Sequence, residues 1–223
     1  QVERGDLEVI VPVDDLGELG RLAEGVNDLV AGLRERELLR DLFGRQVGQT
    51  ELADLADAGP GRSDRREVTV LFVDLQGYTR FSERHSPEEV VAMLNRFFRI
   101  VVAAVNREGG WVNKFEGDAA LCVFGAPQPD GRHAAQALAA AASLRRDLGR
   151  TTDILPAGIG VSTGPAIAGF IGTPERFEYT VIGNCVNVAS RLCELAKHER
   201  SGVMAAVDTW VEAGRPDEWT QLG

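Results

Sequence analysis

Residues 111–125, WVNKFEGDAALCVFG, decide the fold, because two apolar stretches flank a short turn that contains Gly117. This pattern predicts a β-hairpin. A helical pattern precedes it over residues 86–110, with Ser86 as N-cap, Pro87 in the first turn, Glu89 closing a capping box and Gly109 stopping the helix. An alanine-rich helix is predicted after it, over residues 130–148.

Working outward, apolar strands are predicted on both sides of this central unit. One is VTVLFVDL, residues 68–75, and the other is ILPAGIGVSTG, residues 154–164. The order strand, helix, strand, strand, helix, strand predicts an α/β (α+β) domain on the ferredoxin-like, split βαβ plan. Both helices then cover one face of the sheet, and the other face meets solvent or a partner.

A second strand pair is predicted over residues 166–172 and 177–183, followed by a helix over residues 184–196 with Asn184 as its cap. The pair is too apolar for a free-standing ribbon. Two interpretations stay open: an arm that packs on a second copy of the chain, or an ordinary core hairpin.

The first 62 residues carry a different pattern. Apolar residues follow the spacing of a heptad repeat, which predicts a coiled coil with a second copy; they are Leu16, Leu19, Ala23, Val26, Val30 and Leu33. The alternative is a helix packed on its own domain. We expect a helical unit and linker over residues 38–62, ending in a Gly- and Pro-rich boundary, and a separate domain over residues 63–223.

Composition narrows the function classes. The net charge of -10 argues against a general nucleic-acid binder, which needs a basic face. The three cysteines have no CxxC spacing, so a zinc site is not expected. They cannot all pair within the chain, so we expect a reducing environment. No segment reads as a membrane span or a signal peptide.

Two carboxylates point to a metal site. Asp74 ends an apolar strand and Asp118 lies at the hairpin turn, and the split βαβ plan places these two strand ends side by side. An oxygen-only site of this kind suits Mg²⁺ or Mn²⁺, and a pair of such ions would support phosphoryl transfer. Gly77, in the turn after Asp74, would let backbone N–H groups face phosphate oxygens. The simpler alternative for Asp74 is a cap on that turn.

Lys114 is one of two lysines in the chain. A turn formed by Glu116 and Gly117 would set Phe115 opposite Asp118, so that Lys114 points to the other face and serves a different site. Asn187 and Arg191, four residues apart on a predicted helix, would share a face and one ligand. The Arg191 guanidinium has the planar fork that suits phosphate.

Four blocks together resemble the catalytic domain of class III nucleotidyl cyclases, and the class IIIb adenylyl cyclases in particular. They are VTVLFVDLQGYTRFS, NKFEGDAALCVFG, GIGVSTGPAIAGFIG and FEYTVIGNCVNVASRL, in the family's order, and the likeness runs from Val68 to at least Val207. Residues 1–37 resemble the second half of a HAMP linker with its signalling helix. That resemblance implies a membrane region upstream of this chain and a catalytic part on the cytoplasmic side of the membrane.

The resemblance assigns roles residue by residue. Asp74, Leu75 and Asp118 would hold two divalent cations, Mg²⁺ or Mn²⁺, while Gly77, Tyr78 and Thr79 would bind the substrate. Lys114 and Thr180 would read the purine from the opposite protomer of a homodimer with shared active sites. Asn187 would orient the nucleotide, and Arg191 would neutralise charge at the α-phosphate.

With Lys114 and Thr180 at the base, the implied reaction is conversion of ATP to 3',5'-cyclic AMP and pyrophosphate. The alternatives are a guanylate-using cyclase, a diguanylate cyclase, which would want a GGDEF-like turn, and a catalytically silent signalling or dimerisation module. One departure bears on the choice: the family usually carries a later lysine for the triphosphate, and no lysine follows Lys197 in this sequence.

Overall fold

The structure, a computed structural model, describes residues 30, 63–173 and 175–220. The predictions for residues 1–62, namely the partial HAMP unit, the coiled coil and the helical linker, therefore lie outside the described residues apart from Val30.

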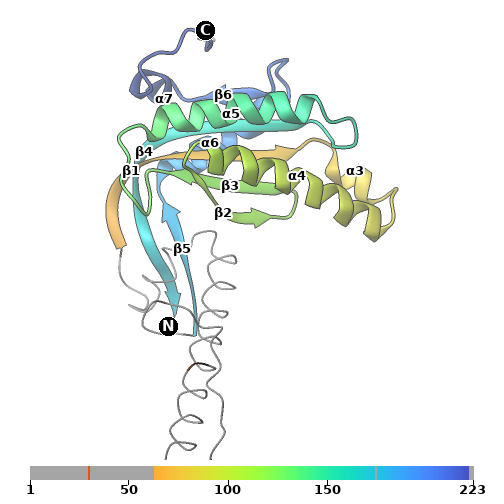
Figure 1. Ribbon diagram of the computed structural model, residues 1–223, viewed down its shortest axis with the longest axis horizontal. Helices are drawn as coiled ribbons and strands as arrows, with labels where there is room; N and C mark the ends of the chain where they lie inside the picture. Colours follow the sequence, from red (N-terminus) through yellow and green to blue (C-terminus); the bar gives the residue numbers. More distant parts are fainter. Residues whose placement is uncertain (1–29, 31–62, 174, 221–223) are drawn as a thin grey trace, which may run out of the picture. The chain divides into compact units, whose positions relative to one another are not determined.

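The predicted elements occur in the predicted order, and three elements that were not predicted are added at Tyr78–Ser82, Val203–Ala205 and Val207–Glu212 (Figure 1). They are β1 (Ser63–Leu75), α3 (Tyr78–Ser82), α4 (Pro87–Arg107), β2 (Trp111–Glu116), β3 (Ala119–Phe124), α5 (His133–Gly149), β4 (Ala157–Thr173), β5 (Arg176–Ile182), α6 (Asn184–Ala196), β6 (Val203–Ala205) and α7 (Val207–Glu212).

The strands form one sheet in the order β2-β3-β1-β4-β5, with β6 pairing parallel to β4. Strand β1 lies in the middle and runs antiparallel to both β3 and β4. The hairpin β2–β3 thus lies beside the first strand, as the split βαβ plan requires. The predicted ferredoxin-like fold with an added strand is confirmed.

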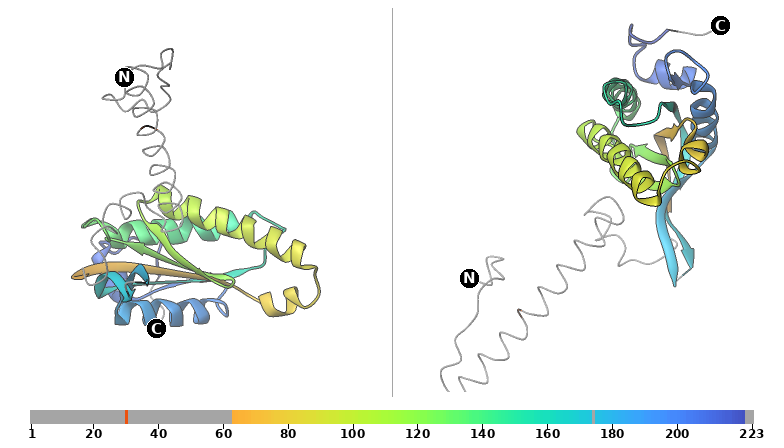
Figure 2. Two further views of the ribbon diagram at one scale, coloured as in Figure 1. Left: turned by 90° about the horizontal axis from the view of Figure 1, so that it is seen from below. Right: turned by 90° about the vertical axis from the view of Figure 1, so that its right-hand side faces the viewer.

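The two faces of the sheet are covered differently (Figure 2). Leu71 and Val73 of β1 point into the main core, where they pack with residues of α4 and α5 such as Phe97 and Leu144. Helix α6 crosses the opposite face, close to β4. A Cβ added at Gly160 would lie 2.1 Å from the Ala189 carbonyl oxygen, so only glycine allows this approach.

Helix α4 begins as predicted. The Ser86 side chain accepts a hydrogen bond from the Glu89 amide, and the Glu89 carboxylate accepts one from the Ser86 amide. This reciprocal arrangement satisfies two of the N–H groups that every helix start leaves without a partner. The cap therefore fixes where α4 begins.

Strand β4 corrects one prediction. The break expected between residues 164 and 166 is absent, and β4 continues through Pro165 from Ala157 to Thr173. Pairing with β6 ends at Val161 and pairing with β5 begins at Ile167, so β1 is the one described strand that pairs with β4 at Pro165. A proline is tolerated there because its missing N–H falls where one side of the strand is unpaired.

The start of α6 corrects the prediction that Asn184 is the helix cap. Asn184 is the first helical residue, and the N-cap is Gly183, whose extended backbone makes no side-chain hydrogen bond. A Cβ on residue 183 would lie 2.7 Å from the Pro165 carbonyl oxygen. Close contact with β4 therefore selects glycine at the cap.

The end of β4 and strand β5 form an arm that extends from the domain (Figure 2). Part of its apolar surface is already buried within one chain: Phe170 and Tyr179 are 4% and 7% exposed, and the Tyr179 ring lies 5.8 Å from that of Trp111. Ile167 and Ile182 remain 40% and 56% exposed. The arm therefore has one side packed on its own domain and apolar side chains left at its surface.

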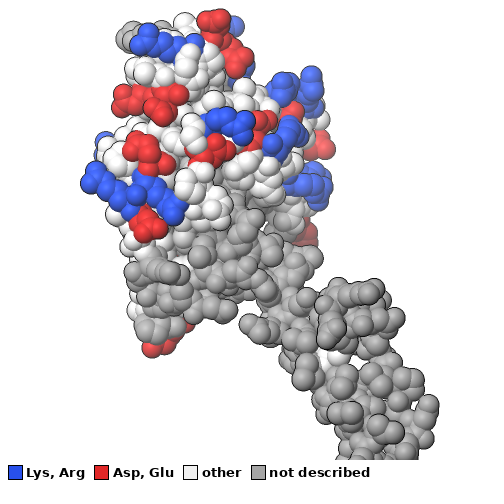
Figure 3. Space-filling view, turned by 60° about the vertical axis from the view of Figure 1, so that its left-hand side comes forward, with Lys and Arg blue, Asp and Glu red and all other residues white. Residues whose placement is uncertain are grey.

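The outer surface of the domain is mixed in charge, with acidic and basic side chains interspersed over the face drawn in Figure 3. Cys122, Cys185 and Cys193 are buried and form no disulfide with one another. Across the described part of the chain, every helix is too short or too polar to cross a membrane.

Candidate active site

The hairpin turn places Asp118 differently from the prediction. Phe115 pairs with Ala120 and Glu116 with Ala119, so the two turn residues are Gly117 and Asp118. The predicted turn is wrong by one residue. Gly117 adopts a left-handed backbone with φ of 65°, which suits the first position of such a turn.

The expectation that Lys114 faces away from the metal carboxylates is also wrong. Lys114 pairs with Leu121, and Leu121 pairs with Phe72, so these three side chains share one face of the sheet. Asp74 lies two residues beyond Phe72 on that same face. The one-residue shift of the turn sets this pairing, because counting back from Glu116 opposite Ala119 places Lys114 opposite Leu121. A bulge between Val112 and Lys114 then changes the register of the residues before Lys114.

Asp74 and Asp118 do come together. Burial, followed by the negative charge of Asp74 and a hydrogen bond with it, raises the pKa of Asp118 to about 6. The Asp118 carboxyl therefore binds a proton more tightly than an ordinary aspartate, because ionising it beside Asp74 brings two negative charges together. The pair therefore has a deficit of positive charge.

Lys197 supplies part of that positive charge. Its role was not predicted from the sequence. Its Nζ donates to Asp74 Oδ2 at 2.6 Å and to Glu194 Oε2 at 2.7 Å, and the Lys197 side chain is only 13% exposed. Burial alone would lower the pKa of Lys197, but the hydrogen bonds to Asp74 and Glu194 raise it. The scarcity of lysine, which drew attention to Lys114, applied equally to Lys197. We call Asp74, Asp118 and Lys197 the carboxylate site.

The carboxylate site fits a divalent cation. A hard metal ion relieves the repulsion between two neighbouring carboxylates as a proton does, and oxygen ligands are those that Mg²⁺ and Mn²⁺ prefer. The described residues contain no group of three or more His, Cys, Asp or Glu side chains able to hold a metal ion. Further ligands would come from the backbone, from water or from a phosphate. Leu75 could contribute only its backbone carbonyl oxygen, because its hydrocarbon side chain has no ligand atom.

The turn after Asp74 has the geometry expected of it. Gly77 has a φ of 81° and precedes the single turn and a half of α3, where Tyr78 is half-buried and Thr79 is exposed. The first N–H groups of a helix have no acceptor within it. The backbone from Gly77 to Thr79 therefore presents donors directly after the carboxylate site.

The two predicted base-reading residues and Asn187, which was predicted to orient the nucleotide, line one pocket of about 350 Å³. Lys114, Thr180 and Asn187 reach it from β2, β5 and α6, and Phe72 and Leu121 form part of its apolar wall. The Lys114 ammonium lies 3.0 Å from Glu116 Oε1. We call this the Thr180 pocket. Its size and its mixed apolar and polar lining suit a flat, polar-edged ring.

Arg191 is not among the residues that line this pocket. It lies one helical turn beyond Asn187 on α6, with an exposed side chain. The shared helix face agrees with the predicted i, i+4 relation.

Thr180 has partners that the sequence argument did not identify. Its Oγ1 donates to Asn113 Oδ1 at 2.9 Å, and Asn113 Nδ2 donates to the Tyr179 carbonyl oxygen at 2.7 Å. Asn113 is the residue at the bulge of β2. Only the position directly before Lys114 could have drawn attention to it.

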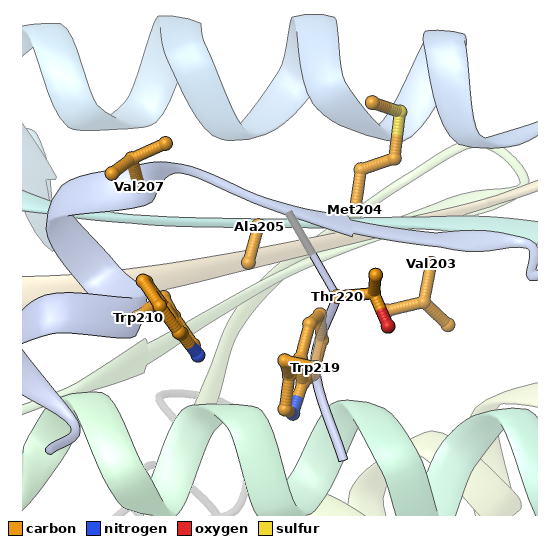
Figure 4. A pocket seen from close by; sticks show the side chains of 7 residues that line it. All are labelled: Val203, Met204, Ala205, Val207, Trp210, Trp219 and Thr220. Carbon is orange, nitrogen blue, oxygen red and sulfur yellow. The ribbon is translucent and has the colours of Figure 1, made fainter. Parts of the chain in front are cut away.

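A separate pocket of about 160 Å³ lies beside β6 and α7 and shares no lining residue with the Thr180 pocket (Figure 4). Its lining is almost wholly apolar, with Thr220 as the exception, and includes Trp210 and Trp219. It contains no titratable side chain that could take part in phosphoryl chemistry. The carboxylate site and the Thr180 pocket therefore carry the functional argument.

Comparison with known proteins agrees with this geometry. A family model described as the adenylate and guanylate cyclase catalytic domain matches residues 62–217. The chain belongs to this family. The uncharacterized proteins Rv1318c and Rv1319c of Mycobacterium tuberculosis are 48% and 47% identical to it, over 98% and 94% of this chain. The chain spans 40% and 39% of their lengths.

Solved structures of both substrate classes resemble the domain. The guanylyl cyclase Cya2 is 33% identical, with a TM-score of 0.58, and the match covers 68% of this chain and 80% of Cya2. The adenylyl cyclase CyaB from P. aeruginosa is 27% identical, with a TM-score of 0.61, and the match covers 69% of this chain and 83% of CyaB. The fold therefore does not distinguish ATP from GTP.

Proposed function

We propose that the chain is an adenylate cyclase, which converts ATP to 3',5'-cyclic AMP and pyrophosphate. The observation that carries this proposal is the pairing, on one sheet face, of a carboxylate site with a pocket that contains Lys114 and Thr180. The first suits a metal-bound triphosphate and the second suits a purine. Each copy of the chain therefore has groups suited to both ends of a nucleoside triphosphate, whether or not the two sets serve the same molecule.

Each residue has a part in the proposed reaction. Asp74 and Asp118 would hold two Mg²⁺ or Mn²⁺ ions, which supply charge neutralisation and activation of the ribose 3'-hydroxyl. Backbone N–H groups from Gly77 to Thr79 would bind phosphate oxygens. Asn187 would orient the ribose, and Arg191 would stabilise charge that develops at the α-phosphate as the 3'-oxygen attacks in line.

ATP is favoured over GTP by the polar groups of the Thr180 pocket. An ammonium donates to the N1 acceptor of adenine, whereas guanine carries a hydrogen on N1. The Thr180 hydroxyl can accept from the 6-amino group of adenine, because its own proton is donated to Asn113.

We further propose that two copies of the chain build each active site, one supplying the carboxylate site and the other the Thr180 pocket with Arg191. Supporting this, the α6 face of the sheet carries both sets of residues, and Ile182, which lines the Thr180 pocket, is 56% exposed. The first 62 residues would bring the two copies together and transmit a signal from a membrane region upstream.

A direct assay tests the proposed function. The chain is incubated with ATP or GTP in the presence of Mg²⁺ or Mn²⁺, and cyclic nucleotide and pyrophosphate are measured separately. We expect cyclic AMP and pyrophosphate in equal amounts. Cyclic GMP as the main product would overturn the substrate assignment. Nucleotide binding without any cyclic product would favour the silent module.

A further inference from the structure

We infer that Asn113 is a positioning residue that sets the base preference of the Thr180 pocket, by holding the Thr180 hydroxyl as a hydrogen-bond acceptor. The inference rests on the proposed function, since it concerns the nucleotide base that the pocket would take. Asn113 is not among the site residues predicted from the sequence.

The orientation of the Asn113 amide is fixed by its two partners. The Tyr179 carbonyl oxygen can only accept, so the amide NH₂ of Asn113 must face it, at 2.7 Å. The amide oxygen then faces Thr180 Oγ1, at 2.9 Å, and accepts a hydrogen bond from the hydroxyl group. A flipped amide would place two acceptors against each other at Tyr179.

The Thr180 hydroxyl therefore has its one proton committed to Asn113. A threonine hydroxyl carries one proton and two lone pairs, so the group left for a ligand is an acceptor. Thr180 is 7% exposed and lines the pocket, so few water molecules can compete for its lone pairs. The 6-amino group of adenine would donate to this oxygen, whereas the 6-oxo group of guanine would face it as a second acceptor.

The bulge of β2 explains how Asn113 reaches Thr180. Val112 pairs with Cys122 and Lys114 with Leu121, which leaves Asn113 without a partner in the ladder. A bulge of this kind redirects a side chain out of the usual alternation. Lys114 therefore lines the pocket directly, and its neighbour Asn113 acts on the pocket through the hydrogen bond to Thr180.

The simpler role for Asn113 is a structural tie between β2 and β5. Both roles predict some loss of stability when the amide is removed. They differ in their effect on selectivity. A structural tie affects ATP and GTP alike, whereas an orienting amide affects the ratio between them.

The test compares the parent chain with the Asn113→Leu variant, which keeps the side-chain size and removes the acceptor. The Thr180 hydroxyl is then free to donate to guanine. We expect the ratio of kcat/KM for ATP over GTP to fall about tenfold, and the ratio of their affinities, measured by competition with a fluorescent ATP analogue, to fall equally. The matched control is Asn106→Leu, an exposed asparagine on α4.

A second variant keeps the test decisive if Asn113→Leu does not fold. Asn113→Ser is shorter and also removes the amide, and the same fall in the ratio is expected. In a Thr180→Val background, either substitution should leave the ratio unchanged, because no hydroxyl remains to be oriented.

The outcomes separate the two proposals. Equal losses for ATP and GTP at Asn113, with the ratio unchanged, would overturn this inference and leave the proposed function intact. A parent chain that binds no nucleotide, or that prefers GTP, would overturn the proposed function and the inference with it.

Discussion

The carboxylate site and the Thr180 pocket lie on the same face of one sheet but rely on different interactions. The carboxylate site consists of charges at short range: Lys197 lies 2.6 Å from Asp74, and the pKa of Asp118 is raised to about 6. The Thr180 pocket relies on hydrogen bonds whose donors and acceptors are already fixed. The carboxylate site is suited to a cation, whereas the Thr180 pocket is preorganised by hydrogen bonds.

This difference predicts which constants each site controls. Substitutions in the carboxylate site should act on metal binding and turnover, because charge there is needed as the reaction proceeds. Substitutions in the Thr180 pocket should act on the affinity and choice of base. A variant in the Thr180 pocket that changes metal binding, or a variant in the carboxylate site that changes only the choice of base, would contradict this comparison.

The largest effect is expected for Asp74→Asn. It removes one negative charge from the carboxylate site, and we expect kcat to fall about 10³-fold and Mn²⁺ binding without nucleotide to be lost. Steady-state kinetics and electron paramagnetic resonance of free Mn²⁺ measure the two. Asp153→Asn, an exposed aspartate elsewhere in the domain, is the matched control and should leave both unchanged.

A smaller effect, on a different constant, is expected for Lys114→Met. Loss of one charged donor to the base should raise KM for ATP about tenfold, with Mn²⁺ binding in the absence of nucleotide preserved. Arg99→Met, at an exposed position of α4, controls for loss of positive charge. If Lys114→Met abolished Mn²⁺ binding, the two sites would not be separate.

Lys197→Met should strengthen metal binding. The ammonium competes with a cation for Asp74, so its removal should tighten Mn²⁺ binding without nucleotide about fivefold. Titration followed by electron paramagnetic resonance measures it, with Arg200→Met as the control. Weaker Mn²⁺ binding in a folded Lys197→Met variant would show that Lys197 supports the metal site and does not compete with it.

The smallest effect concerns pH. In the metal-free chain the pKa of Asp118 is raised from 3.8 to about 6, so the folded state holds a proton that the unfolded state releases between these values. The stability from this proton is fully present below about pH 4 and is lost as the pH rises through 6.

Asp118→Asn is neutral at every pH and lacks this loss. Because Asp118 is partly exposed, we expect a gain of only about 1 kcal/mol in the stability of Asp118→Asn relative to the parent between pH 4 and 7.5. Urea unfolding at the two pH values measures it. A gain equal to that of Asp153→Asn would mean that Asp118 has an ordinary pKa.

Sequence reasoning predicted the features that depend on neighbouring residues. The capping box of Ser86 and Glu89 correctly predicted the start of α4, and the order of the elements correctly predicted which strands pair around β1. It also grouped Lys114, Thr180 and Asn187, although through a family resemblance and not from their spacing.

The errors arose where contacts between distant parts of the chain determine the local structure. The cap of α6 is Gly183 because β4 passes too close for a side chain. The bulge at Asn113 went unpredicted, and its hydrogen-bond partner Thr180 lies 67 residues away. Lys197 reaches Asp74 across 123 residues. No local pattern carries such contacts.

The central claim is that one copy of the chain supplies the carboxylate site and a second copy supplies the Thr180 pocket with Arg191. Mixing Asp74→Ala with Arg191→Ala tests it most directly, since each variant alone should be inactive and both should still dimerise. Random pairing in an equal mixture would give one intact site in every heterodimer, so about a quarter of the parent activity should return. Activity no greater than the mean of the two variants measured separately, from folded and associated chains, would contradict the claim.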